Sequence, residues 1–343
     1  MLTINPDANV ERNLFSAEII TSRLQEILLS DDTNNADINN IIGYLLDNSG
    51  KMIRPRLVTL TSSLYPHNPD IVRDIAVAVE MIHMASLVHD DIIDHALMRR
   101  GRESVNGKWG NQAGVLTGDY LFASAFKLIN YHGLLEIMDN ITETIQIMCS
   151  GEIRQMAMAY NVYISEDDYY DKTFRKTACL FASSCKTGAM ASSMPPEEII
   201  IMEKFGQCVG YAYQIIDDVL DFVSDSSLLG KPVGSDLLQG NITLPVIYAL
   251  QTDYGPWLRT AIEGKKFNGQ KMKKIINLLR DIGALEYSLN RSREFLNQGT
   301  KLLHKLPDLP ARKSLDDLAC YLLNVYYQKL QNYEFRAVQE AVK

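Results

Sequence analysis

The feature that most constrains the fold is a set of long apolar stretches in which apolar and polar residues do not alternate. Ile71–Asp94 and Gly114–Tyr131 are longer than ordinary strands, and Glu197–Asp221 is mostly apolar with scattered polar positions. A strand with one buried face would show period-two alternation, and most strands end within about ten residues. The pattern therefore predicts helices that are buried on most of their sides.

Turn-forming residues separate the apolar stretches along the chain. They cluster at Asp31–Asn40, Pro66–Pro69, Pro195–Pro196, Ser224–Ser235, Tyr254–Pro256 and Pro307–Pro310. No linker, low-complexity tract or internal repeat marks a domain boundary. We expect a single all-α domain over residues 1–343, with a motif-bearing core at about 40–250 and C-terminal helices at 256–343.

The composition disfavours several classes of protein. A net charge of −8 argues against a general nucleic-acid binder, which needs a basic surface for phosphate contacts. The five cysteines lack CxxC spacing, which disfavours a zinc site or a disulfide framework. No apolar run approaches the roughly 18 residues of a membrane span, and Met1–Asn13 lacks a signal-peptide pattern. We therefore expect a cytoplasmic protein without an integral membrane segment.

Two acidic runs end two of the apolar stretches. Their aspartates are Asp90, Asp91 and Asp94 in the first run and Asp217, Asp218 and Asp221 in the second. Residues four apart share a helix face, so each run places two carboxylates one turn apart. Such a pair is unfavourable, and more so among apolar neighbours, unless a cation compensates. Since Mg²⁺ prefers carboxylate oxygens and shares phosphate oxygens with a substrate, the runs predict several Mg²⁺ ions around one diphosphate.

A third segment, Asp167–Asp171, has the same DDxxD spacing but a different context. Ser165 precedes it as a candidate N-cap, and Asp168 would complete a capping box. Acidic groups at a helix N-terminus oppose the helix dipole, so we interpret this segment as structural. The spacing alone is a weak signal, and the position at the end of an apolar helix favours a metal site for the other two runs.

Basic residues near the acidic runs could complement phosphate oxygens. They are Lys51 and Arg54 near the start of a predicted helix, Arg99 and Arg100 after the first run, Lys176 beside Thr177, and Lys231. Each cluster alone is typical of a solvated surface, but their arrangement around both acidic runs favours phosphate binding. His83 lies two turns before Asp90 and is either a core residue or a phosphate ligand.

The motifs occur in the order that is typical of one enzyme family. They are GKxxRP at Gly50–Pro55, EMIHxASLxHDDxxD at Glu80–Asp94, RRG at Arg99–Gly101, GDYLF at Gly118–Phe122, GE at Gly151–Glu152, KTAxLF at Lys176–Phe181, QxxDDxxDF at Gln214–Phe222 and GKPxGxDLxxGxxTLPxIYAL at Gly230–Leu250. The series resembles the all-trans isoprenyl (polyprenyl) diphosphate synthases. Its first block is particularly similar to the catalytic component of heptaprenyl diphosphate synthases.

The resemblance implies a fold and a reaction. The fold is an isoprenoid-synthase-type helical bundle around a deep central cavity, usually dimeric. The reaction is the Mg²⁺-assisted ionisation of an allylic diphosphate, followed by head-to-tail, trans condensation with isopentenyl diphosphate. Because the departed diphosphate can take the proton that is lost, no protein base is assigned.

The resemblance also implies roles for single residues. The metal ligands would be Asp90, Asp94 and Asp217, with Asp91, Asp218 and Asp221 in direct or water-mediated support. Isopentenyl diphosphate would be bound by Lys51, Arg54, His83 and Arg100. The allylic diphosphate would be bound by Arg99, Lys176, Thr177, Gln214 and Lys231.

Product length depends in this family on the residues five and four positions before the first aspartate. Here these are Ala85 and Ser86, and both are small. Each helical turn adds about 5.4 Å of depth, roughly one isoprene unit. The resemblance therefore implies a long product of about six to eight isoprene units.

Two positions depart from the pattern of the family. Asn241 stands where a lysine is common, which removes one possible diphosphate contact. The segment Cys320–Val325 lacks the basic residue that is often found near its end.

Two other functions compete with a synthase. A class I terpene cyclase uses a similar aspartate motif, but it needs no second diphosphate site and carries a different second motif. A regulatory subunit of a heteromeric synthase tends to lose the acidic runs, which this chain keeps. We expect a homodimer, and a catalytic chain that needs a small partner subunit remains an open alternative.

Overall fold

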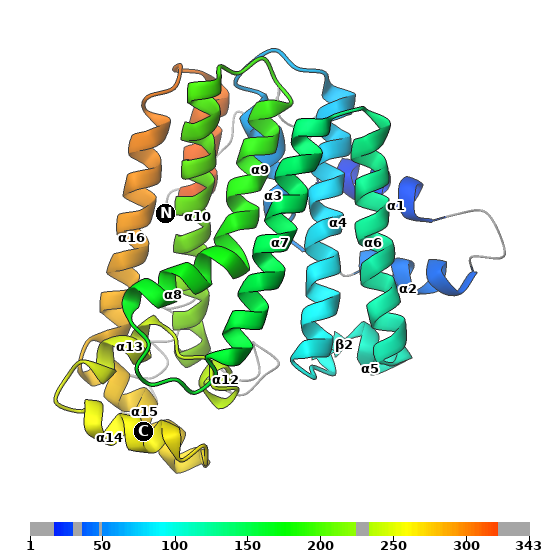
Figure 1. Cartoon of the computed structure of the whole chain (residues 1–343). Coiled ribbons are helices and arrows are strands. Elements are labelled where there is room, and N and C mark those ends of the chain that lie inside the picture. The colour runs from blue at the N-terminus through cyan, green and yellow to red at the C-terminus, as the bar shows by residue number, and fades with distance from the viewer. Residues whose placement is uncertain (1–16, 30–35, 48–49, 224–232, 322–343) are drawn as a thin grey trace, which may run out of the picture. The chain divides into compact units, whose positions relative to one another are not determined.

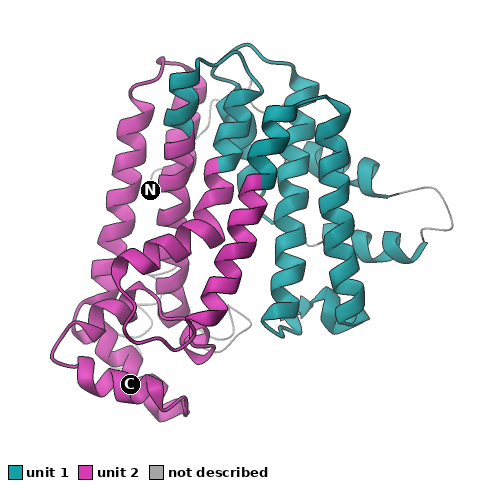
Figure 2. Ribbon diagram, viewed as in Figure 1, with its two compact units in different colours: residues 1–142, 183–202 teal, residues 143–182, 203–343 magenta. Residues whose placement is uncertain are grey.

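The structure, a computed structural model, describes residues 17–29, 36–47, 50–223 and 233–321. The chain divides into two compact units, shown in Figure 2: residues 1–142 with 183–202 form unit 1, and residues 143–182 with 203–343 form unit 2. Helices dominate both units (Figure 1), which confirms the all-α prediction. A single domain over the whole chain stays a prediction.

The helices of each unit follow the chain order closely. Unit 1 holds α1 (Ala17–Leu28), α2 (Ala36–Leu46), α3 (Ile53–Ser62), α4 (Pro69–Ile93), α5 (Val105–Trp109) and α6 (Asn111–Tyr131), with the short antiparallel strands β1 (Met98–Arg99) and β2 (Arg102–Glu103). Unit 2 holds α8 (Glu166–Thr173), the π-helical turn η2 (Phe174–Ala178), α12 (Ser235–Leu238), α13 (Leu244–Leu250), α14 (Gly255–Glu263), α15 (Gly269–Asp281) and α16 (Ala284–Leu303). The chain passes between the units within α7 (Leu135–Ala157), α9 (Cys179–Met190) and α10 (Pro196–Val223). Among the described residues, no helix is both long and apolar enough to cross a membrane.

Helix α4 is the centre of unit 1. The Asn68 side chain caps its first turn by accepting hydrogen bonds from the backbone N–H groups of Asp70 and Ile71, and Pro69 occupies its first position. All residues from Ile75 to Ile82 are buried, and the helix packs most extensively against α6 and α3. The long apolar stretch in the sequence is therefore a helix enclosed by neighbouring helices.

The buried carboxylate of Asp74 joins three segments of unit 1. It is 2% exposed and accepts hydrogen bonds from Arg23 Nε at 2.9 Å and Arg23 Nη2 at 3.2 Å. His132 Nε2 lies 2.8 Å from Asp74 Oδ2, the oxygen that also accepts from Arg23 Nη2. Burial acts to raise the pKa of Asp74, but the hydrogen bonds from Arg23 and His132 outweigh it and lower the pKa below its ordinary value. Helix α1 and the end of α6 are thereby tied to the central helix.

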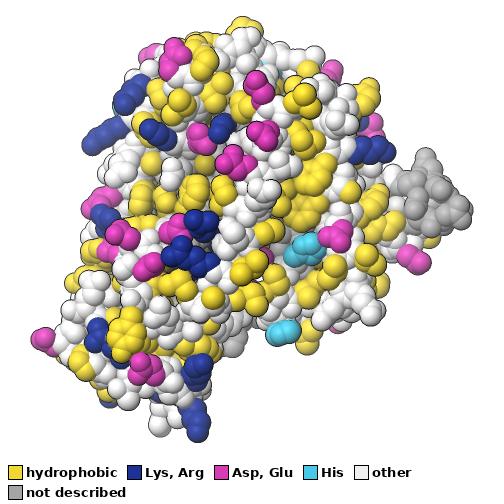
Figure 3. All heavy atoms as spheres, in the orientation of Figure 1, with side chains coloured by type: hydrophobic (Ala, Val, Ile, Leu, Met, Phe, Trp, Pro, Cys, Tyr) yellow, Lys and Arg dark blue, Asp and Glu magenta, His cyan; other side chains and the backbone are white. Residues whose placement is uncertain are grey.

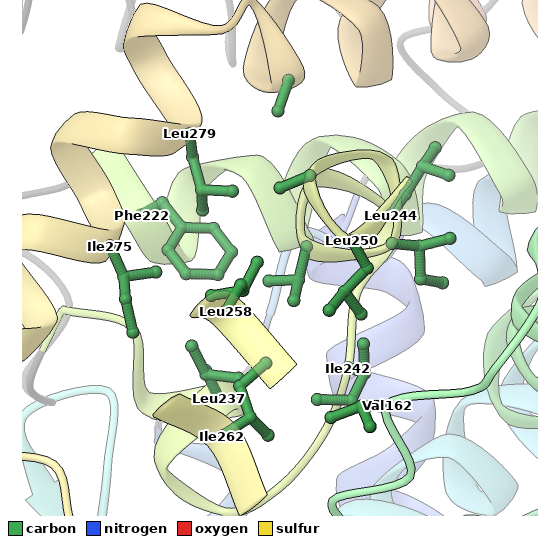
Figure 4. Close-up of a cluster of buried hydrophobic side chains, with 14 of the residues drawn as sticks. Val162, Phe222, Leu237, Ile242, Leu244, Leu250, Leu258, Ile262, Ile275 and Leu279 are labelled. Carbon is green, nitrogen blue, oxygen red and sulfur yellow. The ribbon is translucent and has the colours of Figure 1, made fainter. Parts of the chain in front are cut away.

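The core of unit 2 surrounds the end of α10. Phe222 is fully buried in an apolar cluster to which α12, α13, α14 and α15 also contribute. Figure 4 shows its ring among the side chains of Leu237, Leu258, Ile275 and Leu279. Because Phe222 directly follows Asp221, this core holds the second acidic run in place.

Replacing Asp74 by alanine should strongly destabilise the protein, because Arg23 and His132 lose the carboxylate that holds them together. We expect the free energy of unfolding to fall by about 3–5 kcal/mol, the usual result of removing one partner of a buried ion pair. The control is Asp70→Ala on the same helix, whose exposed carboxylate pairs with Arg73 at 3.0 Å and should contribute less than about 1 kcal/mol. Denaturant unfolding of both variants measures the difference, and equal losses would contradict the assigned role of Asp74.

Candidate active site

The first acidic run lies at the C-terminal end of α4. Asp90 is half-buried, Asp94 is exposed and caps the helix, and the last turn contains no basic residue. The C-terminal end of a helix already carries partial negative charge on its carbonyl groups. Two carboxylates one turn apart at this end are therefore doubly unfavourable, and a bound cation would relieve both effects.

Asp91 is buried, at 5% exposed, unlike Asp90 and Asp94. Arg99 Nε lies 2.8 Å from each of its carboxylate oxygens. The Asn106 side chain donates to the backbone carbonyls of Asp91 and Ala96, which holds the turn after the helix. Asp91 is thus placed to orient Arg99, one of the residues predicted to bind the allylic diphosphate.

Arg100 is positioned by the turn that joins β1 and β2. Arg100 and Gly101 both have positive φ, 50° and 79°, as in the two-residue turns that fit a twisted hairpin. A Cβ atom on Gly50 would lie 3.0 Å from both Nη atoms of Arg100. The absence of a side chain at Gly50 therefore lets Arg100 approach the loop that carries Lys51, so the structure brings these two predicted residues into one part of unit 1.

A buried acid that the sequence analysis did not single out lies beside these cations. Glu80 is 4% exposed, and burial raises its pKa to about 7, although Arg54 and Arg100 act to lower it. Burial also lowers the pKa of His83 well below its ordinary value, and Arg54, Arg100 and Arg99 lower it further. His83 is therefore neutral at pH 7 and can donate a hydrogen bond without adding charge. The signal for Glu80 in the sequence was its position inside a long apolar stretch.

The second acidic run separates exposed and buried carboxylates in the same way. Asp217 is exposed, whereas Asp218 is 2% exposed. Asp218 accepts hydrogen bonds from Tyr169 Oη at 2.7 Å and Gln214 Nε2 at 2.8 Å. Thr177 Oγ1 donates in turn to Gln214 Oε1 at 2.7 Å. The structure thus links three predicted residues, Asp218, Gln214 and Thr177, through consecutive hydrogen bonds.

Asp221 connects the second run to the start of α12. Its carboxylate accepts hydrogen bonds from Ser235 Oγ at 2.8 Å and from the Asp236 N–H at 3.0 Å, at the first turn of α12. Its backbone carbonyl accepts from the N–H of Gly234 at 2.8 Å. These contacts fit the supporting role expected for Asp221. The predicted allylic ligand Lys231 lies outside the described residues.

Lys176 and Thr177 lie in the π-helical turn η2. Such turns widen a helix locally and are frequent at functional sites. Lys176 Nζ donates to Glu152 Oε2 at 3.0 Å, and Gln155 Nε2 donates to the other oxygen of Glu152 at 2.9 Å. A Cβ atom on Gly151 would lie 2.4 Å from Cβ of Arg175, so the glycine is needed for the close approach of α7 to this turn. The GE motif therefore positions Lys176.

The third DDxxD segment has the structural role predicted for it. Ser165 Oγ accepts from the N–H of Asp168 at 3.1 Å, and the Asp168 side chain accepts from the N–H of Ser165 at 3.2 Å, which completes the capping box of α8. Hydrogen bonds from Ser165 lower the pKa of Asp168. Asp171 pairs with Arg154 at 2.7 Å and Arg175 at 3.0 Å. Figure 3 shows acidic and basic side chains close together over this part of unit 2.

The two positions predicted to set product length differ in exposure. Ala85 is fully buried, whereas Ser86 is half-buried and its Oγ donates to the carbonyl of His83 at 2.8 Å. His83, Ser86, Asp90 and Asp94 follow one another at helical spacing and form a less buried stripe along α4. Ser86 therefore shares a face with the predicted metal ligands, and Ala85 lies beside that face.

The donor groups fit Mg²⁺. Asp90, Asp94 and Asp217 offer hard carboxylate oxygens that are at least partly accessible. In the described ranges, no three His, Cys, Asp or Glu side chains gather closely enough to hold a metal ion by themselves. Mg²⁺ does not require such a cage, because it commonly uses one or two protein carboxylates and completes its shell with water and substrate phosphate oxygens.

Replacing Glu80 by glutamine should change how stability depends on pH. Because the folded-state pKa of Glu80 is raised to about 7, its contribution is most favourable below pH 4 and is lost as the pH rises through 7. The glutamine variant lacks this loss. We expect it to gain up to about 3 kcal/mol on the wild type between pH 4 and pH 8, measured by denaturant unfolding.

Glu103→Gln is the control for this measurement, because Glu103 is an exposed acid of the same unit. Its stability should follow the wild-type pH profile throughout. A Glu80→Gln profile parallel to that of the wild type would show that Glu80 does not titrate near pH 7.

This chain matches known proteins of one family. Residues 35–279, more than half of the chain, match the family model described as polyprenyl synthetase. The chain is 40% identical over 279 residues to heptaprenyl diphosphate synthase component 2 of Geobacillus stearothermophilus, covering 81% of this chain and 87% of that protein. It is 33% identical over 286 residues to octaprenyl diphosphate synthase of Escherichia coli strain K12, covering 82% and 88%. The crystal structure of heptaprenyl diphosphate synthase from Staphylococcus aureus matches with a TM-score of 0.83 and 31% identity, over 90% of this chain and 96% of that one. The resemblance is thereby confirmed, and the chain belongs to the polyprenyl synthetase family of prenyltransferases.

Proposed function

We propose that this chain condenses isopentenyl diphosphate with an allylic prenyl diphosphate, head to tail and in trans geometry, to give a long-chain polyprenyl diphosphate. The observation that carries the proposal is the placement of two acidic runs at the C-terminal ends of apolar helices, each beside ordered cations. In unit 1, Arg99 contacts Asp91, and Arg54 and Arg100 lie near Glu80 and His83 earlier on α4. In unit 2, Lys176 directly precedes Thr177, which hydrogen-bonds to Gln214 and through it to Asp218. Such sites bind metal-complexed diphosphates.

Each group of residues has a role in the proposed reaction. Bound Mg²⁺, held by Asp90, Asp94 and Asp217, would neutralise charge that builds on the leaving diphosphate. Arg99, oriented by Asp91, and Lys176, held by Glu152, would grip the allylic diphosphate, together with Thr177, Gln214 and Lys231. These donors favour C–O ionisation because they are fixed before charge develops.

The second substrate would be bound by a separate group of donors. Lys51, Arg54 and Arg100 would hold isopentenyl diphosphate, and neutral His83 would add a hydrogen bond. The double bond of this substrate attacks the allylic cation, and the proton that leaves is taken by the released diphosphate. No protein base is assigned. A terpene cyclase would leave this second group of cations without a ligand, so we disfavour that alternative.

The proposed product is long, at about six to eight isoprene units by the depth argument. The small side chain of Ser86 on the stripe with Asp90 supports an open path along α4. The names of the heptaprenyl and octaprenyl relatives support the same range.

We further propose a cytoplasmic homodimer that can recruit a second polypeptide. Exposed apolar side chains on α6 and the start of α7, including Leu116 at 67%, Tyr131 at 82% and Leu135 at 75%, support association. The word "component" in the name of the Geobacillus relative supports a partner subunit. If a partner is required, the purified chain will be inactive alone and active once the second polypeptide is added.

The proposal is tested by product analysis with labelled isopentenyl diphosphate and farnesyl diphosphate, with and without Mg²⁺. The wild type should give a Mg²⁺-dependent product longer than geranylgeranyl diphosphate. Asp90→Asn and Asp217→Asn should each lower kcat by about 100-fold or more, since each removes charge that holds the metal.

Asp167→Asn is the matched control, because Asp167 is an exposed aspartate of the structural DDxxD segment. Its activity should stay within about twofold of the wild type. Products no longer than geranylgeranyl diphosphate would overturn the long-chain proposal alone. Full activity of Asp90→Asn and Asp217→Asn would overturn the assignment of the metal site.

A further inference from the structure

Lys172, which no motif of the sequence analysis includes, occupies an unusual position near the end of α8. Its Nζ donates to Asn241 Oδ1 at 2.5 Å and to the backbone carbonyl of Ile242 at 3.0 Å. The ammonium also lies 5.3 Å from the ring centre of Tyr169, whose hydroxyl donates to Asp218. Lys172 is therefore in direct contact with the one position in this region where the expected lysine is missing.

Charges of both signs surround the ammonium of Lys172. Lys172 and Lys176 are four residues apart on consecutive turns, and like charges at this spacing repel. Burial lowers the pKa of Lys172, whereas the carboxylates of Asp218 and Asp236 act to raise it. Lysine ammonium groups bind phosphate oxygens, so a diphosphate would offset the repulsion between Lys172 and Lys176.

The contact explains why position 241 carries asparagine. A lysine at position 241 would add a second cation to this contact, whereas the side-chain carbonyl of Asn241 accepts a hydrogen bond from Lys172. The turn at residues 240–241 is held by backbone hydrogen bonds that do not involve these two side chains. The Asn241 N–H donates to the Asp236 carbonyl at 2.8 Å, and the Tyr160 N–H donates to the Gly240 carbonyl at 2.8 Å. Positions 172 and 241 are thus alternative sources of one cation at this contact.

We propose that Lys172 binds the allylic diphosphate, and that it supplies from α8 the ammonium that Asn241 lacks. The inference rests on the proposed function, because the diphosphate it binds is the one assigned to Lys176, Thr177 and Gln214. Asn241 and Ile242 accept two of the three hydrogens of the ammonium, and the third is directed to a phosphate oxygen. Asn241 positions the ammonium and does not itself supply charge.

The test measures binding of inorganic diphosphate with Mg²⁺ by calorimetry, so it does not depend on turnover. Lys172→Met should weaken binding by about tenfold to a hundredfold, the usual effect of losing one charge-assisted contact. Lys172→Gln keeps a donor for Asn241 without the charge and should weaken binding similarly. Lys172→Arg should stay within about threefold of the wild type, because the charge is retained.

The double variant Lys172→Met with Asn241→Lys tests the exchange of the two positions directly. It should recover most of the lost affinity, since the ammonium returns from the other side of the contact. Lys274→Met is the control, because Lys274 is a unit 2 lysine that also lies over an aromatic ring, 4.7 Å from the centre of Trp257. Thermal unfolding of each variant verifies that it is folded.

In the active enzyme, Lys172→Met should affect the KM values of the two substrates differently. Lys172→Met should raise KM for farnesyl diphosphate about tenfold or more and change KM for isopentenyl diphosphate less than about threefold. Wild-type affinity in Lys172→Met and Lys172→Gln would overturn the inference, as would a loss that Asn241→Lys fails to restore. A wild type that binds diphosphate but forms no prenyl product would contradict the proposed function. The binding measurements on the Lys172 variants would still test the role of Lys172 in binding diphosphate.

Discussion

The site depends on one unfavourable electrostatic arrangement, in which carboxylates occupy the C-terminal ends of helices. Asp90 and Asp94 lie where the backbone of α4 already carries partial negative charge, and the last turn has no basic residue. Asp217 lies near the end of α10, whose last turn also lacks one. The acids of α8 show the contrast, because they lie at a helix N-terminus and are stabilised there by a capping box and by arginines. Carboxylates with the same DDxxD spacing thus stabilise a helix at its N-terminus, whereas at its C-terminus they favour binding of a cation.

Within each acidic run, neighbouring aspartates differ in burial and therefore in their proposed roles. Asp91 and Asp218 are buried and hold Arg99 and Gln214, which are themselves proposed substrate ligands. The predicted metal ligands are more accessible, since Asp90 is half-buried and Asp94 and Asp217 are exposed. Each run therefore combines a preorganised support with accessible ligands, and fixed donors of this kind stabilise developing charge without reorganising during the reaction.

The sequence was sufficient to predict the helices but not the contacts between them. The apolar stretches Ile71–Asp94, Gly114–Tyr131 and Glu197–Asp221 correspond closely to α4, α6 and α10, because periodicity and turn residues are local signals. The capping box at Ser165 and Asp168 was predictable for the same reason. Helical spacing also placed Asp90 and Asp94 on one face, but which neighbours that face meets depends on tertiary packing.

The features that sequence reasoning missed all join residues far apart in the chain. Burial raises the pKa of Glu80 against the opposing effect of Arg54 and Arg100, which come from two other segments. Lys172 contacts Asn241, 69 positions further along the chain. The π-helical turn at Lys176 packs closely against α7 at Gly151, a contact that no local sequence pattern predicts. Asn241 alone suggested a lost contact, and only the structure shows a second cation beside it.

The most direct test of the central claim compares the stability of the wild type and Asp94→Asn with and without Mg²⁺ and inorganic diphosphate. Without ligand, Asp94→Asn should be the more stable protein by about 0.3–1 kcal/mol, since it removes a like charge from the negative end of α4. With Mg²⁺ and diphosphate at about 100 times Kd, the wild type should gain about 2.7 kcal/mol and the variant much less, so the order should reverse. A variant that is less stable than the wild type without ligand, or that gains as much from Mg²⁺ and diphosphate, would contradict the claim that these helix ends are built to receive a cation.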